Sequence, residues 1–318
     1  MNRDQNIDLV KGVCIILMVM GHAGAPFRDF IYLFHMAVFF IVAGYLYNTK
    51  YSDSFPGVMS FWIKRLNSLY KPFVLWNIFY LLLNNIFIKY NIYTDNPLFL
   101  LTVEGKDRGI SSILSVADIF NKSLGILTFG SRPQLSSASW FLVVLFSISI
   151  LYASIEYVIK KITNKPKIYH GFISMLFLLF GFYLSSRGIS LPREASITFS
   201  VYFLFYIGVV FRGVDFKSIS VRGLIVILIC SFLILIVCNK VGTIELSHNS
   251  YKNPVYLLFS SISGWFFVYS VVALLPFLKL RFYLSYIGRN TLPILFLHFL
   301  SFKLITFLLW LLMVSQIT

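Results

Sequence analysis

Long blocks of apolar residues, separated by short polar stretches, run along most of this chain. A run of about 20 apolar residues is long enough to cross the hydrocarbon core of a bilayer as a helix. The pattern predicts an all-α fold, a polytopic integral membrane helix bundle, with residues 1–318 forming a single transmembrane domain and no separate soluble domain. Nine spans are expected, at residues 7–24, 31–48, 69–90, 140–160, 168–186, 196–212, 221–239, 254–277 and 290–315.

Two stretches between the spans have a different character. Residues 56–68 combine apolar and basic positions, which is typical of an amphipathic segment that lies in the membrane interface. The connection 91–139 is too long for a simple turn, and long loops of this kind are often functional. We expect it to act as a lid or to bind an acceptor.

The composition agrees with a membrane protein, since 58% of the residues are hydrophobic and only 12% are charged. A net charge of +15 would suggest a nucleic-acid partner if the protein were soluble. No basic run is interleaved with aromatic residues, however, and no zinc-finger or RNA-binding signature occurs. We therefore expect no nucleic-acid partner. The three cysteines lie in apolar runs and are expected to be core residues.

The distribution of Lys and Arg predicts the orientation of the chain. Short loops on the cytoplasmic side of a membrane protein carry an excess of basic residues. This rule places the N-terminus and the loop at 160–168 in the cytoplasm, and the long connection 91–139 outside it. The lipid bilayer itself is thus the first partner that the sequence predicts.

Ionisable residues inside the first two spans are the strongest sign of chemistry. Lys11 and His22 are eleven residues apart, which places them on one helix face about 16 Å apart along the axis. Asp8 precedes Lys11 by three residues and shares that face. His35 opens the second span, so the two histidines are expected at one membrane depth. Charged groups are expensive in lipid, which makes each of these residues a functional candidate.

These residues also carry a resemblance to a known family. The pattern resembles the start of the membrane acyltransferase-3 family, and most of all its fucose-4-O-acetylase-like, polysaccharide O-acetyltransferase branch. The basic residue, ten intervening positions and histidine from Lys11 to His22 match the best-known signature of that family. The other matching pieces are Arg3, Ile7-Asp8, Lys11-Gly12, Gly21-His22, Phe34-His35-Met36, Phe39-Phe40 to Gly44-Tyr45, Trp140-Phe141-Leu142, and Ile287-Gly288-Arg289-Asn290-Thr291 followed by His298.

The resemblance implies a fold and an activity. The family is usually drawn with ten transmembrane helices in a bacterial cytoplasmic membrane. Its members transfer an acyl group, usually acetyl from acetyl-CoA, to a hydroxyl of an envelope or exported carbohydrate. In that reaction His22, supported by His35, would act as the general base, and Asp8 with Lys11 would form a supporting charge pair. Direct transfer and an acyl-enzyme relay are both compatible with the sequence.

A basic segment after the second span is the candidate site for acyl-CoA. Many family members carry Arg-x-x-Arg here, and Arg65 matches its first position, whereas Ser68 stands at the second. Lys64 and Lys71 are the candidates that compensate for the missing arginine. Guanidinium and ammonium groups suit the phosphates of coenzyme A.

Residues near the fourth span are candidates for acceptor binding. Arg132, Ser139 and Trp140 offer hydrogen bonds to sugar hydroxyls and an indole for the apolar face of a sugar. The alternative is an ordinary polar loop that ends in a membrane-interface tryptophan. His298 either lines the same cavity or is a core histidine paired with a neighbouring helix. His170 and His248 are expected at an interface or in a loop, without a role.

Two other function classes remain open from the sequence. A proton-coupled transporter or flippase of an envelope glycan precursor would also have many spans and intramembrane ionisable residues, although no inverted repeat is visible. A structural membrane subunit would leave Lys11 and His22 unexplained. No metal site is predicted, because the histidines lack i,i+4 spacing, HExxH does not occur and no carboxylate cluster accompanies them.

Overall fold

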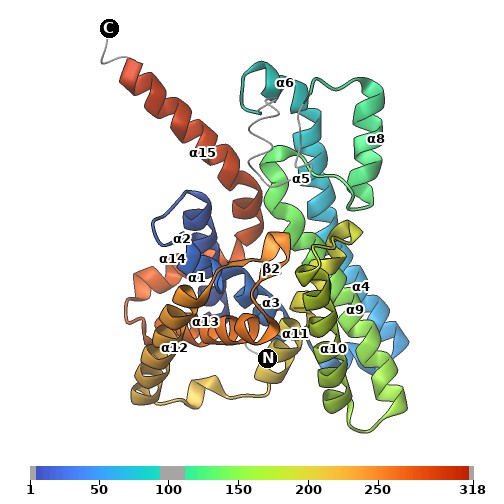
Figure 1. The fold of residues 1–318 in the computed structure, drawn as a ribbon, viewed down its shortest axis with the longest axis vertical. Coiled ribbons are helices and arrows are strands. Elements are labelled where there is room, and N and C mark those ends of the chain that lie inside the picture. The colour runs from blue at the N-terminus through green and yellow to red at the C-terminus, as the bar shows by residue number, and fades with distance from the viewer. Residues whose placement is uncertain (1–4, 94–111, 315–318) are drawn as a thin grey trace. The chain divides into compact units, whose positions relative to one another are not determined.

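The structure is a computed structural model that describes residues 5–93 and 112–314 (Figure 1). Helices dominate it, and the prediction of an all-helical membrane bundle is confirmed. Two short strands, β1 and β2, pair antiparallel in one hairpin. The main helices are α1 Gln5–His22, α2 Arg28–Tyr32, α3 His35–Tyr45, α4 Phe55–Arg65, α5 Lys71–Leu82, α6 Asn84–Lys89, α8 Val116–Leu127, α9 Trp140–Ile162, α10 Pro166–Ser186, α11 Ala195–Phe211, α12 Val221–Val241, α13 Pro254–Leu274, α14 Leu278–Arg289 and α15 Thr291–Val314.

Short helical turns and the hairpin connect these helices. They are the 3₁₀ turns η1 Thr49–Asp53, η3 Gln134–Ser139, η4 Pro192–Glu194, η5 Phe216–Ser218 and η6 Leu246–His248, the π-helical turn η2 Leu66–Tyr70, and the strands β1 Ile244–Glu245 and β2 Ser250–Tyr251.

Eight helical segments of the described chain are long and apolar enough to cross a membrane. They agree with eight of the nine predicted spans, and the chain is a multi-pass membrane protein. The eight segments are Gln5–His22, Arg28–Tyr45, Gln134–Ile162, Pro166–Ser186, Pro192–Phe211, Val221–Val241, Pro254–Leu274 and Thr291–Met313.

The ninth predicted span, 69–90, is present as two helices in series. Helix α5 ends at Leu82 and α6 begins at Asn84, with Leu83 at ψ −1° between them. The side chains of Asn84 and Asn85 form hydrogen bonds with the backbone of residues 112 and 114. The two adjacent asparagines in the middle of the apolar run are the local reason for the break.

The chain divides into two compact units. The first consists of Met1–Arg65 with Val144–Thr291, and the second consists of Leu66–Val143 with Leu292–Thr318. In the first unit α3 is the central helix, because each of its residues from His35 to Gly44 is buried. It packs against α1, α11 and α13, which is the arrangement expected for a helix that is hydrophobic on all faces.

Glycines allow the central helices to approach closely. A Cβ atom on Gly44 of α3 would collide with the carbonyl of Phe205, and one on Gly208 of α11 would collide with the carbonyl of Ile41. Small residues permit such backbone contact between membrane helices. The Gly44-Tyr45 piece of the family pattern is therefore a packing position.

The second unit is organised around α5. Trp76 of α5 stacks on Phe296 of α15 with ring centroids 5.4 Å apart, and the Tyr80 hydroxyl donates to the Phe296 carbonyl at 2.7 Å. Helix α8 packs beside α5 and begins with a capping box, in which Ser115 and Asp118 satisfy each other's backbone N–H groups. Part of the predicted 91–139 connection is therefore helical, and its residues 94–111 lie outside the described residues.

The burial of the cysteines differs from the prediction at one position. Cys14 and Cys238 are buried as expected, but Cys230 is exposed on α12. Only about a fifth of the α12 span is buried within the protein. An apolar surface of this kind is accounted for by lipid rather than by a protein core.

Candidate active site

The ends of three helices meet around Tyr32. His22 is the last residue of α1, Tyr32 the last of α2 and His35 the first of α3. The Tyr32 hydroxyl lies 3.4 Å from Nδ1 of His22, and the two rings meet edge to face with centroids 6.2 Å apart. The Tyr32 ring also lies 5.0 Å from the ring of His35, centroid to centroid. The structure thus brings both predicted histidines to one tyrosine, which the sequence analysis did not single out.

Gly21 makes this arrangement possible. A Cβ atom at position 21 would lie 2.5 Å from Cε1 of Tyr32, closer than real Cβ contacts come. The absence of a side chain therefore lets the Tyr32 ring lie against the last turn of α1. This contact gives a physical reason for glycine before histidine in the Gly21-His22 piece of the family pattern.

The surroundings of His35 determine which of its nitrogens carries the proton. Nδ1 lies 2.8 Å from the backbone carbonyl oxygen of Ile31. A carbonyl only accepts hydrogen bonds, so Nδ1 is the donor, and in the neutral ring Nε2 is the acceptor. His35 is buried, with 4% of its surface exposed, whereas His22 is exposed. Of the two histidines, His22 is the one that a large substrate can reach.

A charged pair extends the cluster beyond Tyr32. The guanidinium carbon of Arg28 lies 4.7 Å from the centre of the Tyr32 ring, and Nη2 of Arg28 lies 3.5 Å from a carboxylate oxygen of Glu245. Glu245 belongs to the β1–β2 hairpin and also accepts a hydrogen bond of 2.7 Å from the Ser247 hydroxyl. Sequence analysis missed Glu245, although the chain has only 12 acidic residues and each one is a marked position in an apolar protein.

A second cluster lies at the start of α1. The ammonium of Lys11 lies 2.9 Å from one carboxylate oxygen of Asp8, and Nε of Arg289 donates to the other at 3.2 Å. The Asp8 side chain is 3% exposed. The ion pair between Asp8 and Lys11 expected from their spacing is therefore present, and Arg289 of α14 is an additional partner that spacing alone did not reveal.

Two facing glycines bring α14 to α1 at this point. A Cβ atom on Gly12 would collide with the carbonyl of Leu284, and one on Gly288 would collide with the carbonyl of Asp8. With no side chain at either position, the two backbones approach closely enough for Arg289 to reach Asp8. The Lys11-Gly12 and Gly288-Arg289 pieces of the family pattern thus belong to one contact.

The basic residues predicted for acyl-CoA lie at the end of α4 and the start of α5. The guanidinium carbon of Arg65 lies 4.7 Å from the centre of the Phe61 ring, and burial lowers the pKa of Arg65 to about 10, so the group remains charged at neutral pH. The Lys64 ammonium lies 3.5 Å from the Tyr51 hydroxyl. Lys71 is exposed and opens α5 in the second unit. Their contact with coenzyme A stays a prediction.

The residues predicted to bind the acceptor are largely buried in the second unit. Ser139 is fully buried, and its hydroxyl accepts a hydrogen bond of 3.4 Å from the side-chain nitrogen of Asn77. The side-chain oxygen of Asn77 accepts a hydrogen bond of 2.7 Å from the Ser136 hydroxyl. Trp140 is 7% exposed and meets Phe141 edge to face, while Arg132 is partly exposed. A contact between these residues and an acceptor stays a prediction.

His298 lies within α15 of the second unit and is 4% exposed. Its Nδ1 donates to the carbonyl of Leu295 at 3.0 Å, and its ring lies 4.0 Å from that of Phe299. The second unit thus supplies a buried histidine surrounded by aromatic rings, and a role for it in a cavity remains a prediction.

The prediction that His170 lies at an interface or in a loop is wrong. His170 is fully buried in α10, with Nδ1 2.5 Å from a carboxylate oxygen of Glu156 and Nε2 2.8 Å from the Tyr202 hydroxyl. Its ring also stacks on Tyr152 at 3.9 Å. Helices α9 and α11 cover His170 and supply its polar partners. His248 lies in a loop turn, η6, as predicted.

The described residues contain no group of three or more His, Cys, Asp or Glu side chains arranged to hold a metal ion. In comparisons with known proteins, the family model for an acyltransferase domain, acyltransferase-3, matches residues 4–318. The match covers essentially the whole chain. A search of curated proteins and a search of solved structures each gave no match.

Proposed function

This chain belongs to the acyltransferase-3 family and is a membrane acyltransferase, and on that premise we propose that it moves an acetyl group from acetyl-CoA to a hydroxyl of a cell-envelope or exported carbohydrate. We place it in a bacterial cytoplasmic membrane with its N-terminus in the cytoplasm, in accordance with the distribution of basic loop residues. Family membership favours this enzyme over a glycan transporter.

The convergence of His22 and His35 on Tyr32 is the observation that carries the proposal. His22 is exposed, and its Nδ1 lies within hydrogen-bond distance of the Tyr32 hydroxyl, while the buried His35 donates its Nδ1 proton to the Ile31 carbonyl. Histidine titrates near neutral pH and is the commonest general base in enzymes. The exposed imidazole would be the proton acceptor, and Tyr32, whose ring lies beside that of His35, would position it.

The reaction balances with these groups alone. His22 takes the proton of the acceptor hydroxyl, whose oxygen attacks the thioester carbonyl carbon of acetyl-CoA. A C–O bond forms, the C–S bond breaks, and the proton leaves with the coenzyme A thiol. An acyl-enzyme relay would split the same exchange into two such steps.

The donor is expected to bind through the basic residues near the α4–α5 junction. Arg65 is charged and partly buried, which suits a fixed contact with a phosphate. Lys64, next to Arg65 on α4, would add positive charge around the same ligand, and Lys71 remains a further candidate contact. On the acceptor side, Arg132, Ser139 and Trp140 remain the proposed carbohydrate contacts, and the burial of Ser139 and Trp140 means that the acceptor would need local opening to reach them.

The test of the proposal is acyl transfer by purified protein in detergent, without a membrane gradient. We expect free coenzyme A to be released from acetyl-CoA in a manner that depends on a glycan acceptor. The His22→Gln variant keeps hydrogen bonding but is a poor base at neutral pH, and loss of a general base costs about 10²- to 10⁴-fold in rate. Its unfolding should match that of the unaltered protein.

Two results would contradict the proposal. Near-normal specific activity of His22→Gln would remove His22 from catalysis. Failure of the unaltered protein to release coenzyme A with any glycan acceptor, combined with gradient-dependent glycan movement in vesicles, would favour the transporter.

A separate measurement tests the donor site. Arg65→Ala should raise the KM for acetyl-CoA about 10- to 150-fold, since a hydrogen bond to a charged group contributes about 1.5–3 kcal/mol, and it should leave the KM for the acceptor nearly unchanged. The matched control is Arg222→Ala, which removes an exposed arginine next to the start of α12. Equal KM values in the Arg65 variant and the unaltered protein would make Lys64 or Lys71 the next candidate.

A further inference from the structure

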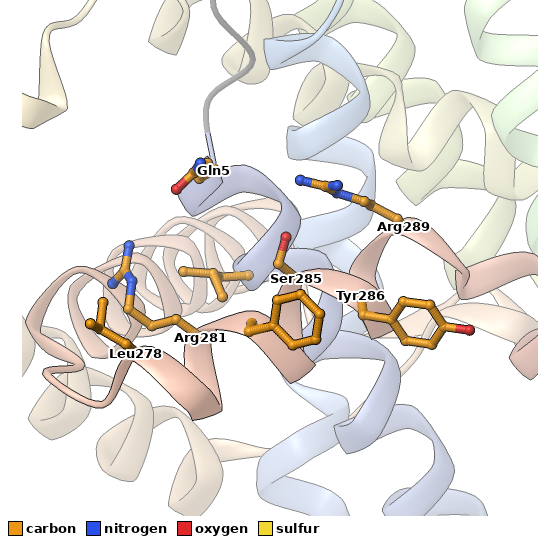
Figure 2. A pocket seen from close by; sticks show the side chains of 8 residues that line it. Gln5, Leu278, Arg281, Ser285, Tyr286 and Arg289 are labelled. Atoms are coloured by element: carbon orange, nitrogen blue, oxygen red, sulfur yellow. The ribbon is translucent and has the colours of Figure 1, made fainter.

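A pocket of about 330 Å³ lies in the first unit, between the start of α1 and one face of α14 (Figure 2). This volume is at the lower end of the range for small-molecule sites, roughly 300–1,000 Å³. Both guanidinium groups of α14 line it. The polar lining consists of Gln5 from α1 and of Arg281, Ser285, Tyr286 and Arg289 from α14.

The charge around the pocket is unbalanced. Arg281 donates to the Val272 carbonyl at 2.6 Å and to the Asn6 side-chain oxygen at 2.8 Å. Both of these partners are uncharged, so neither of them offsets the positive charge of Arg281. Arg289 contacts Asp8, but that carboxylate is shared with Lys11. Within the described part of the chain, one carboxylate, that of Asp8, thus lies near three cations, so the described residues around the pocket carry an excess of positive charge.

The pocket is also bordered by large apolar side chains. Leu278 is 81% exposed and Phe282 is 70% exposed, and both line it. Tyr286 is 63% exposed beside them. A soluble anion would find complementary charge here but would leave these side chains in water. An amphiphile with an anionic group and an apolar part matches both features.

The ends of two candidate spans place the pocket at the depth of lipid headgroups. Arg281 binds carbonyls at the end of α13, and the side chain of Asn6 lies in the first turn of α1. A span ends where the hydrocarbon core gives way to the interface. Amphipathic helices such as α14, with apolar side chains beside basic ones, lie in this interface and are attracted to anionic lipids.

We propose that the pocket between α1 and α14 binds the phosphate of an anionic membrane phospholipid. Arg281 and Arg289 contact the phosphate oxygens, the Ser285 hydroxyl adds a hydrogen bond, and the lipid chains lie along Leu278 and Phe282. Arginine suits this role because its planar fork binds phosphate through two N–H groups. The bound lipid balances the charge and ties α14 to the start of α1.

The experiment measures lipid binding by the purified full chain in neutral detergent. Phosphatidylglycerol and phosphatidylcholine are titrated separately, and bound lipid is counted by native mass spectrometry. We expect one phosphatidylglycerol site and no comparable phosphatidylcholine site. Arg289→Gln should weaken the phosphatidylglycerol site about tenfold. Ser285→Trp should weaken it at least as much, because the indole fills the pocket while both guanidinium groups remain.

Lys279→Gln is the matched control. Lys279 lies on the same helix and is exposed, but it does not line the pocket. Its replacement removes one positive charge and should change phosphatidylglycerol binding less than twofold. Thermal unfolding without added lipid shows whether each variant is folded, and Arg281 is left unaltered because it binds the end of α13. If Arg289→Gln perturbs folding through Asp8, Ser285→Trp still decides the outcome.

Three results would overturn the proposal. The first is equal binding of the two lipids. The second is an equal loss of phosphatidylglycerol binding in Lys279→Gln, Ser285→Trp and Arg289→Gln, which would mean diffuse attraction to the helix. The third is displacement of phosphatidylglycerol by acetyl-CoA, with a loss of acetyl-CoA affinity in Ser285→Trp, which would assign the pocket to the phosphates of coenzyme A. None of these readouts requires acyltransferase activity, so they are independent of the proposed reaction.

Discussion

At its start, α1 is joined to α14 by a buried carboxylate between two cations, whereas at its end His22 meets Tyr32 of α2 through a 3.4 Å hydrogen bond and an edge-to-face ring contact. The centre of the first contact is buried, because the side chain of Asp8 is only 3% exposed. In the second, His22 is exposed. Helix α1 therefore has one end that is closely packed against a neighbouring helix and one end that is exposed.

The glycines show the same difference. At the start of α1, the atom that would obstruct a side chain on Gly288 is a backbone carbonyl, which has little freedom to move. At the other end, the atom that would obstruct a side chain on Gly21 belongs to the Tyr32 ring, which can rotate. The comparison suggests that the start of α1 anchors the helix and that its end can adapt to a substrate.

Removal of the buried carboxylate should have the largest effect on stability. Asp8→Ala leaves Lys11 and Arg289 without their shared partner. We expect a loss of about 3 kcal/mol, the low end of the range for a buried ion pair that loses one member, because Arg289 is half exposed and can turn toward water. The measurement is unfolding in mixed detergent micelles.

The control for this variant is Asp53→Ala. Asp53 pairs with Lys160 at 2.7 Å but is 61% exposed, and exposed pairs contribute at most about 1 kcal/mol. If the two variants lost equal stability, burial at Asp8 would not distinguish the two ion pairs, and the start of α1 would not be an anchor.

The glycines allow a direct comparison of the two ends. Gly288→Ala should cost about 1–3 kcal/mol, since a methyl group against a carbonyl forces the backbones apart. Gly21→Ala should cost less stability, because the Tyr32 ring can move, but it should lower acyl transfer by displacing that ring from His22. Unfolding and specific activity are measured on both variants.

Gly213→Ala serves as the reference for this pair, because the one heavy atom near its added Cβ lies at an ordinary contact distance of 3.4 Å. Gly213→Ala should change neither the free energy of unfolding nor the specific activity appreciably. If Gly21→Ala lost as much stability as Gly288→Ala and kept full specific activity, the interpretation that the end of α1 can adapt to a substrate would be wrong.

The smallest effect is expected at the Tyr32 hydroxyl. Tyr32→Phe keeps the ring beside His35 and removes the hydroxyl, which lies 3.4 Å from Nδ1 of His22 and also hydrogen-bonds Arg28. A bond of this length is worth at most the lower part of the usual range of about 0.5–1.5 kcal/mol, so kcat should fall about two- to fivefold while stability stays the same. A steeper fall, near that of His22→Gln, would give Tyr32 a direct part in proton transfer.

The local part of the candidate site followed from the sequence because helix geometry fixes it. Asp8 and Lys11 are three residues apart, so they face each other in any α-helix. The sequence also predicted that His22 and His35 lie at one membrane depth, because a short turn joins the two apolar runs. By contrast, His170 was misjudged, because the burial of a helical residue depends on which helices cover it.

The sequence by itself determined that the chain is a helical membrane protein, where eight of its long apolar helices lie, and which residues carry the family pattern, because apolar run length and residue spacing within a helix are local properties. Only the tertiary structure decided that Arg289 reaches Asp8, 281 positions away, that Tyr32 links the two histidines, and that Glu156 and Tyr202 enclose His170. Such contacts depend on which helix faces approach, and this is decided by the packing of many side chains and by the glycines where backbones touch.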